Sequence, residues 1–347
     1  MKIVYLVTYP GNGGAEAYSL YLAREARLAG HEVCFVLGEE TGELVEKVRE
    51  EKFDLLFLPM KSSFNPFAVL NSVFKLRRII SDYKPDIIHT QMLREQSLVI
   101  AAKIFGSKTK LVRTFHRLDQ FDWKMLPLMW LYQKDTDAFI AVSDFVKEYL
   151  AVNGIHKKVY VIRNGTVEVE TKIKKKGLGY LGRIAPEKGI YKFIESNKEL
   201  LSKTSLTVGG DGPEIEALSN LVQKKSINVK LLGRVENRNK FFELFNVLVL
   251  PSSTEALPLV VIEAFSAGTP VVAFDLPSLR GLINENNGAL VKAGDYKKLA
   301  SKAIEIMNSK EYKKYSTSAK ALYKHSFTVE KTWFDTERLY QKLTSKA

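Results

Sequence analysis

Short, nearly uninterrupted apolar runs alternate with helical patterns from the start of this chain. The run "KIVYLVTY" at residues 2–9 precedes an amphipathic stretch at 15–30, which leads directly into "HEVCFVL" at 31–37. Strands that are apolar on both faces need cover on both faces, and helices supply this cover in parallel sheets. The pattern therefore predicts repeated βαβ units built around a parallel sheet.

The same pattern runs through two series. The candidate strands of the first series are residues 2–9, 31–37, 54–60, 86–91, 110–116, 138–143 and 158–165, and those of the second are residues 178–184, 206–212, 228–235, 247–253 and 270–275. A chain of 347 residues is long enough for two domains. We expect an α/β fold with two Rossmann-like, doubly wound parallel-sheet domains at 1–166 and 167–327, followed by a helical segment at 328–347.

Composition limits the compartment and the partners. Cys34 is the only cysteine, so no intrachain disulfide can form, and its apolar neighbours predict a buried structural thiol. The N-terminal apolar run is too short for a signal-peptide core, and no apolar stretch of about 18 residues occurs, so we expect a cytoplasmic protein. The net charge of +13 favours a polyanionic partner: nucleic acid, an anionic lipid surface or a phosphorylated substrate.

A glycine-rich turn, "PGNGGAE", follows the first predicted strand. Gly13 and Gly14 allow a ligand to approach the backbone closely, and the helix that follows presents free N–H groups to an anion. A dinucleotide fingerprint that starts at Gly11 would need a third glycine where Glu16 stands, so a dinucleotide cofactor is disfavoured. An ordinary tight turn accounts for the same glycines equally well.

Two loops of the second series also lead into helices. "VGGDGPEIEAL" places Pro213 at the first position of a predicted helix, and "PSSTEALPLVVIEAF" places Pro258 at the same position after the strand at 247–253. The amides of Leu259 and Val260 then point out of the helix start, beside the carboxyl ends of the strands. Open α/β sheets bind their ligands at this edge.

Two acids flank the second of these helix starts. Glu255 belongs to the loop before the helix, and Glu263 lies about one turn inside it. In one interpretation Glu255 caps the helix and Glu263 is exposed to solvent. However, the helix is so apolar that it must be largely buried, and a buried carboxylate needs a partner. Hydrogen bonds from ligand hydroxyls would provide one, so the acids and the anion-binding helix start together predict a site for a sugar nucleotide.

The spacing from Glu255 to Glu263 resembles the E-x7-E signature of retaining glycosyltransferases of family 4, which have the GT-B fold. Further segments stand in that family's order: "GNGGAE" at 11–16, "TFH" at 114–116, "DAFIAVS" at 137–143, "RNG" at 163–165, "LGRIAPEKG" at 181–189, "GGDGPE" at 209–214, "LLGRV" at 231–235 and "SAGTPVVAF" at 266–274. The resemblance covers almost the whole chain. It implies two domains that face a cleft, with the helix at 328–347 crossing back to the N-terminal, acceptor-side domain.

The resemblance also implies roles for individual residues. Arg183 and Lys188 match the pair that holds the donor diphosphate, where charge-assisted hydrogen bonds stabilise the departing phosphate. Glu263 matches the acid that binds the ribose hydroxyls, and Glu255 matches the acid near the transferred sugar. His116 matches a residue near the reacting end of that sugar, although a lone histidine at a strand end is otherwise more often structural. The implied catalytic set is His116, Glu255, Arg183 and Lys188.

The donor site implied in this way is larger than the catalytic set. The backbone around Arg234 and Val235 is expected to meet the base. The donor-binding residues are Gly13, Gly14, Arg183, Lys188, Gly210, Arg234, Val235, Glu255, Leu257, Leu259, Val260 and Glu263.

The implied reaction transfers a sugar, with retained configuration, from an α-linked nucleotide sugar to a saccharide or lipid-linked saccharide. The donor is expected to be a UDP-sugar, with a GDP-sugar as the alternative, and the product to belong to cell-surface polysaccharide or lipopolysaccharide. No cofactor and no obligatory metal are expected. "DTD" at 135–137 has the form of a metal-binding D-x-D motif, but Asp137 opens a predicted strand, and we interpret it as structural.

The aromatic segment "DQFDWKMLPLMWLYQK" at 119–134 has two interpretations, a buried helix or a surface that contacts the acceptor or a membrane. Together with "FKLRR" at 74–78 and the positive net charge, the second interpretation suggests peripheral attachment to anionic lipid at the inner face of the cell membrane. The rival function is a non-catalytic, basic two-domain protein that binds anionic lipid or nucleic acid. For the enzyme itself, no nucleic-acid partner is expected.

Overall fold

The computed structural model describes residues 1–11, 13–60, 66–104, 106–116, 132–172, 175–225 and 227–345. The chain folds into two compact units. Unit 1 comprises Met1–Gly165 and Val329–Ala347, and unit 2 comprises Thr166–Thr328.

Unit 1 contains a sheet of seven parallel strands in the order β3-β2-β1-β4-β5-β6-β7. The strands are β1 (Lys2–Val7), β2 (Glu32–Leu37), β3 (Asp54–Phe57), β4 (Ile87–Thr90), β5 (Lys110–Phe115), β6 (Ala138–Ala141) and β7 (Val159–Val161). In register, Ile3 of β1 lies between Val33 of β2 and Ile87 of β4. Every candidate strand of the first series is confirmed. The chain runs outward in opposite directions from β1 and β4, which makes their carboxyl ends the switch point of this sheet.

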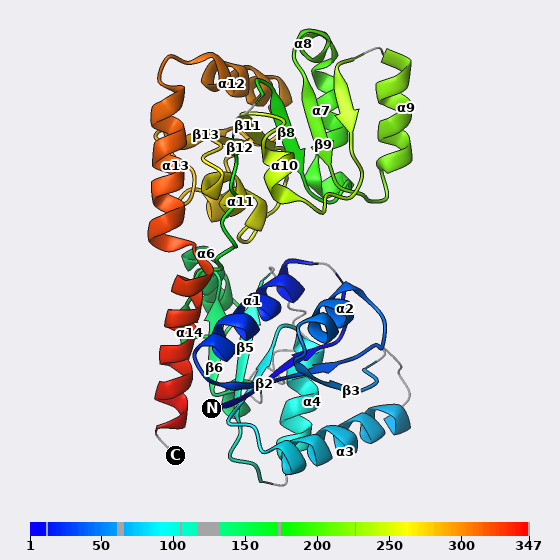
Figure 1. Ribbon diagram of the computed structural model, residues 1–347, viewed down its shortest axis with the longest axis vertical. Coiled ribbons are helices and arrows are strands. Elements are labelled where there is room, and N and C mark those ends of the chain that lie inside the picture. Colours follow the sequence, from blue (N-terminus) through cyan, green and yellow to red (C-terminus); the bar gives the residue numbers. More distant parts are fainter. Residues whose placement is uncertain are drawn as a thin grey trace. The chain divides into compact units, whose positions relative to one another are not determined.

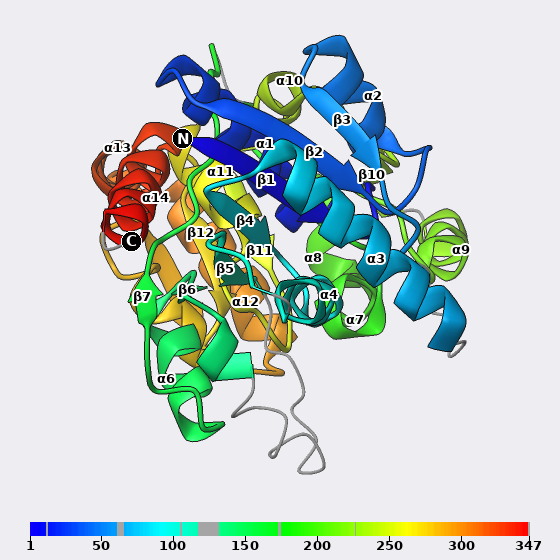
Figure 2. The same cartoon turned by 90° about the horizontal axis from the view of Figure 1, so that it is seen from below.

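Helices cover both faces of this sheet, as near-continuous apolar strands require. One face carries α1 (Gly14–Leu28), α2 (Glu43–Glu50) and α14 (Val329–Thr344), and the other carries α3 (Pro66–Tyr83) and α4 (Leu93–Lys103) (Figures 1 and 2). A further helix, α6 (Asp144–Val152), packs beside β6 and β7. Cys34 lies on the face that carries α3 and α4 and is buried, so the predicted buried thiol is confirmed; burial raises the pKa of this thiol to about 12.

The last helix, α14, is part of the core of unit 1. Its Trp333 and Tyr340 are buried in the cluster that also holds α1. The Tyr340 hydroxyl lies 2.5 Å from Nδ1 of His89 on β4. Burial lowers the pKa of His89 to about 3, so its ring stays neutral and links the strand to the helix.

Unit 2 contains a second parallel sheet, of six strands, in the order β10-β9-β8-β11-β12-β13. The strands are β8 (Leu178–Leu181), β9 (Leu206–Gly209), β10 (Val229–Leu231), β11 (Val247–Leu250), β12 (Val271–Phe274) and β13 (Gly288–Val291). The five candidate strands of the second series are confirmed. The edge strand β13 was not predicted, because "GALV" is short and has a single β-branched residue.

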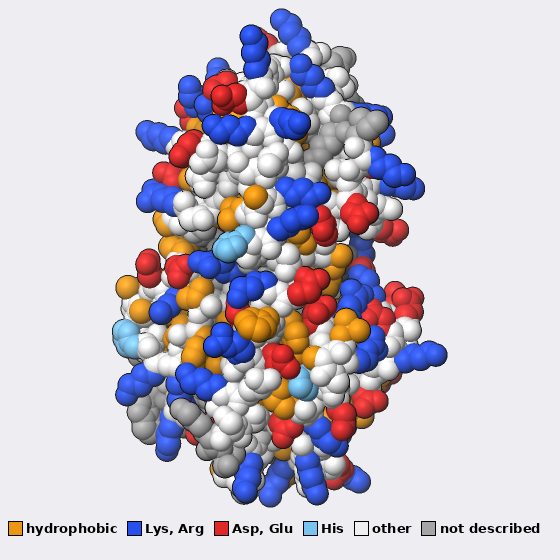
Figure 3. Space-filling view, turned by 60° about the vertical axis from the view of Figure 1, so that its left-hand side comes forward, with side chains coloured by type: hydrophobic (Ala, Val, Ile, Leu, Met, Phe, Trp, Pro, Cys, Tyr) orange, Lys and Arg blue, Asp and Glu red, His pale blue; other side chains and the backbone are white. Residues whose placement is uncertain are grey.

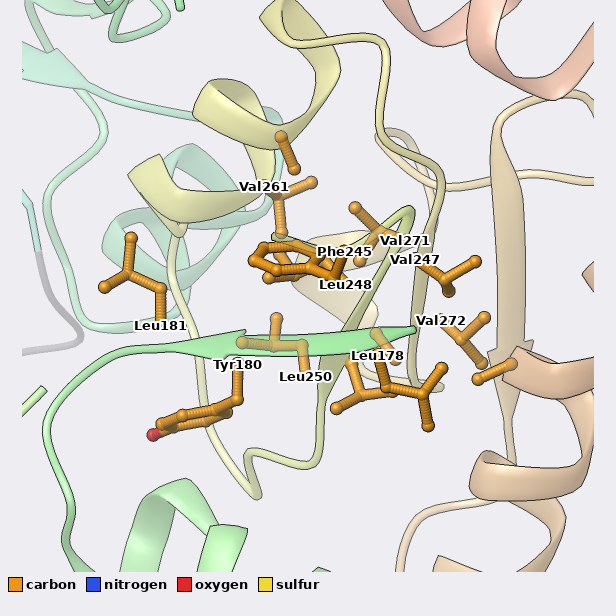
Figure 4. Packing of buried hydrophobic residues seen from close by; sticks show 14 of the residues in the cluster. Leu178, Tyr180, Leu181, Phe245, Val247, Leu248, Leu250, Val261, Val271 and Val272 are labelled. Atoms are coloured by element: carbon orange, nitrogen blue, oxygen red, sulfur yellow. The ribbon is translucent and has the colours of Figure 1, made fainter. Parts of the chain in front are cut away.

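Helices flank this sheet as well. They are η2 (Pro186–Lys188), α7 (Ile190–Ser196), α8 (Lys198–Lys203), α9 (Ile215–Lys225), α10 (Arg238–Phe242), α11 (Leu259–Ser266), η3 (Pro277–Leu279), α12 (Tyr296–Asn308) and α13 (Tyr312–Ser326). Figure 4 shows how β8 packs: Phe245 and Val261 lie on one side of it and Tyr180 on the other. A Cβ on Gly179 would collide with the ring of Phe245, so glycine lets this ring lie against the strand.

Three details differ from the sequence-based expectations. Pro258 precedes α11 as its N-cap, with an extended ψ of 113°, and does not form the first helical residue. Helix α9 begins at Ile215, two residues beyond the predicted start at Pro213. Val169 lies between the two predicted series of strands and was assigned to neither, yet it is buried, and its N–H donates to Oγ of Ser266 over 3.0 Å. The start of unit 2 is thus fastened to its own core. Among the residues described, no helix is both long and apolar enough to cross a membrane.

Candidate functional site

Lys188 and Glu255 meet at the carboxyl ends of the two central strands of unit 2. Lys188 ends η2, after β8, and Glu255 lies in the loop after β11. Since β8 leads on to β9 on one side and β11 leads on to β12 on the other, this is the switch point of the sheet. Nζ of Lys188 lies 2.7 Å from Oε1 of Glu255, and the two side chains are 26% and 9% exposed. The pair forms a partly buried ionic contact at the place where open α/β sheets bind ligands.

The two loops are held together by backbone contacts. The N–H and the hydroxyl of Ser253 donate to the carbonyl of Glu187 over 2.9 and 3.1 Å. Gly189 has a φ of +69°, and a Cβ there would collide with the carbonyl oxygen of Pro251. Glycine is therefore required for the loop to approach its neighbour and to hold Lys188 beside Glu255.

Arg183 lies two residues beyond the end of β8. Its carbonyl accepts a hydrogen bond of 2.8 Å from the Tyr180 hydroxyl, and Ile184 donates to the carbonyl of Asp211 over 2.8 Å. Gly210 has a φ of +131°, and a Cβ there would collide with the carbonyl of Gly182, so this glycine serves the packing of the two loops. The backbone of Arg183 is thus fixed. Its guanidinium is exposed and contacts no carboxylate among the described residues, so it can accept an anion.

Helix α11 starts beside this pair. Its first N–H groups, those of Leu259 and Val260, have no acceptor within the described part of the chain, and no side chain caps the helix. Leu257, Leu259 and Val260 are half-buried against the core of unit 2. The interpretation in which Glu255 caps this helix is therefore wrong, because its carboxylate faces Lys188 and leaves the amides open.

Glu263 is almost buried, with 15% of its side chain exposed, which excludes a solvent-exposed position. Nε of Arg238 lies 3.4 Å from its Oε1, and Nη1 of Arg238 donates to the carbonyl of Val235 over 2.8 Å. Burial raises the pKa of Glu263, and Arg238 opposes this shift. Sequence analysis did not identify Arg238 as the protein side chain that pairs with Glu263. Its place at the start of α10, three residues after Val235 in the segment assigned to the base, was the available signal.

The loop that carries Arg234 and Val235 follows β10. Gly233 turns it with a φ of +64°, and a Cβ on Gly209 would collide with the side chain of Val235. Arg234 is exposed and Val235 is half-buried. Through Arg238, this loop is connected to Glu263 on α11. The carboxyl ends of the strands of unit 2 thus carry two acid–base pairs, two exposed arginines and an open helix start.

In unit 1, His116 directly follows β5 and is held from both sides. In the tautomer that carries its proton on Nε2, the ring donates to Oε1 of Gln91 over 2.7 Å and accepts from Nδ2 of Asn164 over 3.2 Å at Nδ1. The ring of Tyr18 meets it edge-on at 4.8 Å. Gln91 and Asn164 are both nearly fully buried. Sequence analysis missed Gln91 and Asn164, although Gln91 ends one predicted strand and Asn164 lies next to the end of another.

The acid that fixes Gln91 is Glu95, at the start of α4. Its fully buried carboxylate accepts hydrogen bonds from the N–H groups of Gln91, Met92 and Thr8, over 2.7, 2.9 and 2.7 Å. Burial raises the pKa of Glu95, and these hydrogen bonds oppose the shift. Glu95 therefore connects the ends of β1 and β4 at the switch point of unit 1 and orients the residue that holds His116.

The glycine-rich turn of unit 1 also lies at a helix start. Gly13 is the N-cap of α1 and Gly14 its first residue. A Cβ on Gly13 would collide with the carboxylate of Glu16, so an acid of the protein itself lies at this helix start. The role of these glycines in donor binding stays a prediction.

Asp137 supports the sheet of unit 1. Its Oδ2 accepts a hydrogen bond of 2.9 Å from the N–H of Leu111 and lies 3.4 Å from Nζ of Lys103. This geometry agrees with the structural role assigned to the D-x-D sequence. In the part of the chain that the structure describes, no group of three or more His, Cys, Asp or Glu side chains could hold a metal ion.

Two family models match successive parts of this chain. The model described as Glycosyltransferase Family 4 matches residues 12–167, and the model described as Glycosyl transferases group 1 matches residues 166–322. Together they span both sheets. The chain belongs to glycosyltransferase family 4.

Two curated relatives of this family 4 glycosyltransferase are named for a lipid-linked glycan and for a capsular polysaccharide. One is the GalNAc-α-(1→4)-GalNAc-α-(1→3)-diNAcBac-PP-undecaprenol α-1,4-N-acetyl-D-galactosaminyltransferase of Campylobacter jejuni, 27% identical over 90% of this chain and 91% of the relative. Another is the capsular polysaccharide biosynthesis glycosyltransferase CapM of Staphylococcus aureus, 24% identical over 82% of this chain and 83% of the relative.

Solved structures establish the fold. The crystal structure of Anabaena HepE in complex with UDP-glucose superposes with a TM-score of 0.85 at 19% identity and covers 100% of both chains. The predicted GT-B fold, with its two Rossmann-like parallel-sheet domains, is confirmed. The activity of the chain is that of a glycosyltransferase.

The family 4 motifs fall at strand ends in both units. Within unit 2 the structure brings together Lys188, Glu255 and the start of α11, with Arg183 in the adjoining loop. His116, Gly13 and Gly14 belong to unit 1. Of the segment at 119–134, residues 119–131 lie outside the described residues; Tyr132 contacts Oγ of Ser97 through its hydroxyl, over 2.9 Å.

Proposed function

We propose that this glycosyltransferase moves a sugar, with retention of configuration, from an α-linked UDP-sugar to a saccharide or lipid-linked saccharide acceptor in cell-surface polysaccharide synthesis. The cluster of Lys188, Glu255 and Arg183 beside the open start of α11 carries the proposal. It offers two cations for a diphosphate and one carboxylate for sugar hydroxyls, and Glu263 on α11 offers a second carboxylate. The Campylobacter relative, named for a lipid-linked acceptor, and the UDP-glucose complex of HepE support the acceptor and donor classes.

In the proposed reaction, the acceptor oxygen forms a bond to the anomeric carbon as the bond from that carbon to the diphosphate oxygen breaks. The acceptor proton passes to the departing phosphate on the same face. The protein's part is electrostatic: Arg183 and Lys188 stabilise the negative charge that develops on the diphosphate. Because Lys188 already contacts Glu255 at 2.7 Å, the lysine is held in place before the donor binds.

The remaining roles follow from the same geometry. Glu263 binds the ribose hydroxyls, and Arg238, 3.4 Å away, favours the ionised form of its carboxylate next to the loop of Val235, which meets the base. Glu255 contacts the transferred sugar. We propose that no divalent cation is required, since two basic side chains supply the charge. The assignment of His116 to the reacting end of the sugar remains a proposal.

Thermal unfolding of the full chain with UDP-, GDP- and ADP-sugars, and with the corresponding diphosphates, tests the donor class. Under saturation at about a hundred times the dissociation constant, a ligand adds about 2.7 kcal/mol to the free energy of unfolding. UDP compounds are expected to stabilise the protein in EDTA as well as in Mg²⁺. If only GDP-sugars stabilise it, the alternative donor is correct. Stabilisation by no nucleotide would favour the non-catalytic basic binder.

A product analysis tests the stereochemistry. Once an acceptor is found, the new glycoside is analysed by proton NMR. When the donor sugar is glucose or galactose, we expect the small H1–H2 coupling constant of an α-linkage. A large coupling would mean inversion and would overturn the retaining mechanism.

A further inference from the structure

Exposed apolar side chains of unit 1 gather on α3. Among the described residues, eleven large apolar side chains are strongly exposed, and four of these belong to this one helix: Phe67, Val69, Leu70 and Phe74, at 79%, 40%, 52% and 60%. The other seven are scattered over different elements. Single exposed apolar residues are ordinary, but a cluster indicates an interaction surface.

Phe67, Leu70 and Phe74 of this group do not lie on the face by which α3 joins its own unit. Leu76 and Ile80 pack into the core cluster under the helix, and Oγ of Ser72 donates to the carbonyl of Pro59 over 2.7 Å. Phe67 and Phe74 are seven residues apart and so lie on one side of the helix, roughly opposite Leu76. Helix α3 is therefore apolar on two sides, and the folded unit buries only one of them.

Cations adjoin the exposed apolar side. Lys75, Arg77 and Arg78 are all exposed, and the next basic residue, Lys84, follows the helix end. The only acid between residues 66 and 84 is Asp82, whose carboxylate lies 3.6 Å from Nε of Arg78. Aromatic and leucine side chains next to lysine and arginine suit the interface of an anionic bilayer, where the apolar groups enter the acyl boundary and the cations meet the phosphates.

The position of α3 within unit 1 leaves room for such contact. The helix lies on the opposite side of the sheet from α14 (Figure 2), and of the described helices α4 is its main neighbour. Its 18 residues form a rod of about 27 Å, which is long enough to lie along a membrane surface. It does not cross one.

We propose that α3 docks unit 1 onto an anionic lipid surface, with Phe67, Leu70 and Phe74 entering the interface and Lys75, Arg77 and Arg78 contacting lipid phosphates. This inference goes beyond the proposed sugar transfer and does not depend on the donor. It would hold the enzyme at the membrane where lipid-linked acceptors reside.

Co-sedimentation of the full chain with vesicles tests the proposal. The protein is expected to bind mixed phosphatidylcholine–phosphatidylglycerol vesicles but not pure phosphatidylcholine, and to dissociate as salt is raised. The double variant Leu70→Ser/Phe74→Ser should bind at least about tenfold more weakly, because apolar insertion is lost. Lys75→Gln/Arg78→Gln should also bind at least about tenfold more weakly. No nucleotide is added, so the result is independent of the donor proposal.

A matched control is Phe334→Ser on α14. Phe334 is also exposed, at 53%, and also lies near cations, Lys331 and Arg338, but among the described residues α14 has no second strongly exposed large apolar side chain. The Phe334→Ser variant should bind vesicles as tightly as the native chain does. Circular dichroism verifies folding, and Phe67→Ser serves as a second probe if the double variant unfolds.

Two results would overturn the proposal. One is that the native chain does not bind anionic vesicles, or that both α3 variants bind as it does. The other is that the native chain forms a dimer in solution that Leu70→Ser/Phe74→Ser disrupts, without vesicle binding. In that case the surface belongs to a second copy of the chain.

Discussion

The pairing of Glu263 with Arg238 explains how an apolar helix keeps an acid. The side chain of Glu263 is 15% exposed, and Arg238, itself 37% exposed, is near enough to favour the ionised form. Burial nevertheless dominates, so the pKa of the carboxyl lies above its ordinary value of 4.5. An acid held in this way binds hydroxyl donors strongly, because a ligand supplies the hydrogen bonds that water cannot.

Glu263→Gln is expected to separate stability from binding. The native state binds the Glu263 proton more tightly than the unfolded chain does, so its stabilising contribution is full below pH 4.5 and is lost as pH rises through the raised pKa. Glutamine does not titrate, so the variant has no such pH-dependent loss. As pH rises from 4.5 to 8, the free energy of unfolding of the variant should therefore increase relative to that of the native chain. Its affinity for UDP should fall about tenfold, because a charged acceptor is replaced by a neutral one.

Circular dichroism across that pH range and calorimetric titration with UDP measure the two effects. The matched control is Glu195→Gln, which changes an exposed acid of α7 and should alter neither quantity. An unchanged affinity for UDP in Glu263→Gln would exclude the ribose-binding role.

At the residue scale, the sequence predicted the acids but not all of their partners. Glu255 and Glu263 stood out because each belongs to an apolar segment where an ionised side chain is unfavourable. Arg238 and Gln91 did not stand out, because each contacts a residue 25 positions away along the chain. Lys188 and Glu255 were both predicted, but their ion pair joins residues 67 positions apart and appears only in the folded unit.

At the scale of elements, the packing of α14 against β4 is the contact most dependent on polar groups. His89 is fully buried, and its two ring nitrogens contact the Tyr340 hydroxyl at 2.5 Å and Oγ1 of Thr114 at 2.7 Å. Both nitrogens are satisfied only when α14 is in place. Helix α14 therefore completes the core of unit 1, although it follows unit 2 in the chain.

Tyr340→Phe tests this contact. The substitution keeps the ring but leaves Nδ1 of His89 without its partner in a buried place, which is expected to lower the free energy of unfolding of unit 1 by about 1–3 kcal/mol. Urea denaturation followed by the fluorescence of Trp333, on the same helix, reports the change. Tyr9→Phe, at a tyrosine that is 46% exposed, should have almost no effect. Equal midpoints for the two variants would contradict the proposed coupling.

Most elements could be predicted because strands covered on both faces are continuous apolar runs. The starts of α9 and α11 were placed one or two residues early, because proline is compatible both with the first helical position and with the extended residue before it. Strand β13 escaped notice because register with β12 defines it, and "GALV" by itself has little strand preference.

At the scale of the whole molecule, the net charge of +13 does not mark the functional surfaces. Lys and Arg side chains are spread over the face shown in Figure 3 and alternate with Asp and Glu. Two cationic sites differ from this background because each combines positive charge with a second kind of structural feature. Arg183 and Lys188 adjoin an open helix start and buried acids, and the cations of α3 adjoin exposed aromatic rings.

In the proposed function, the strand ends of unit 2 form the donor site of a glycosyltransferase. Calorimetric titration of UDP into the full chain in EDTA, with Arg183→Ala and Glu263→Ala as variants, tests it most directly. We predict one saturable site in the native chain and at least about tenfold weaker binding in each variant. Lys192→Ala and Glu195→Ala, which alter exposed charges on α7, should bind like the native chain. If the native chain does not bind UDP, or if all four variants bind it as well as the native chain does, the donor site does not lie at the strand ends of unit 2.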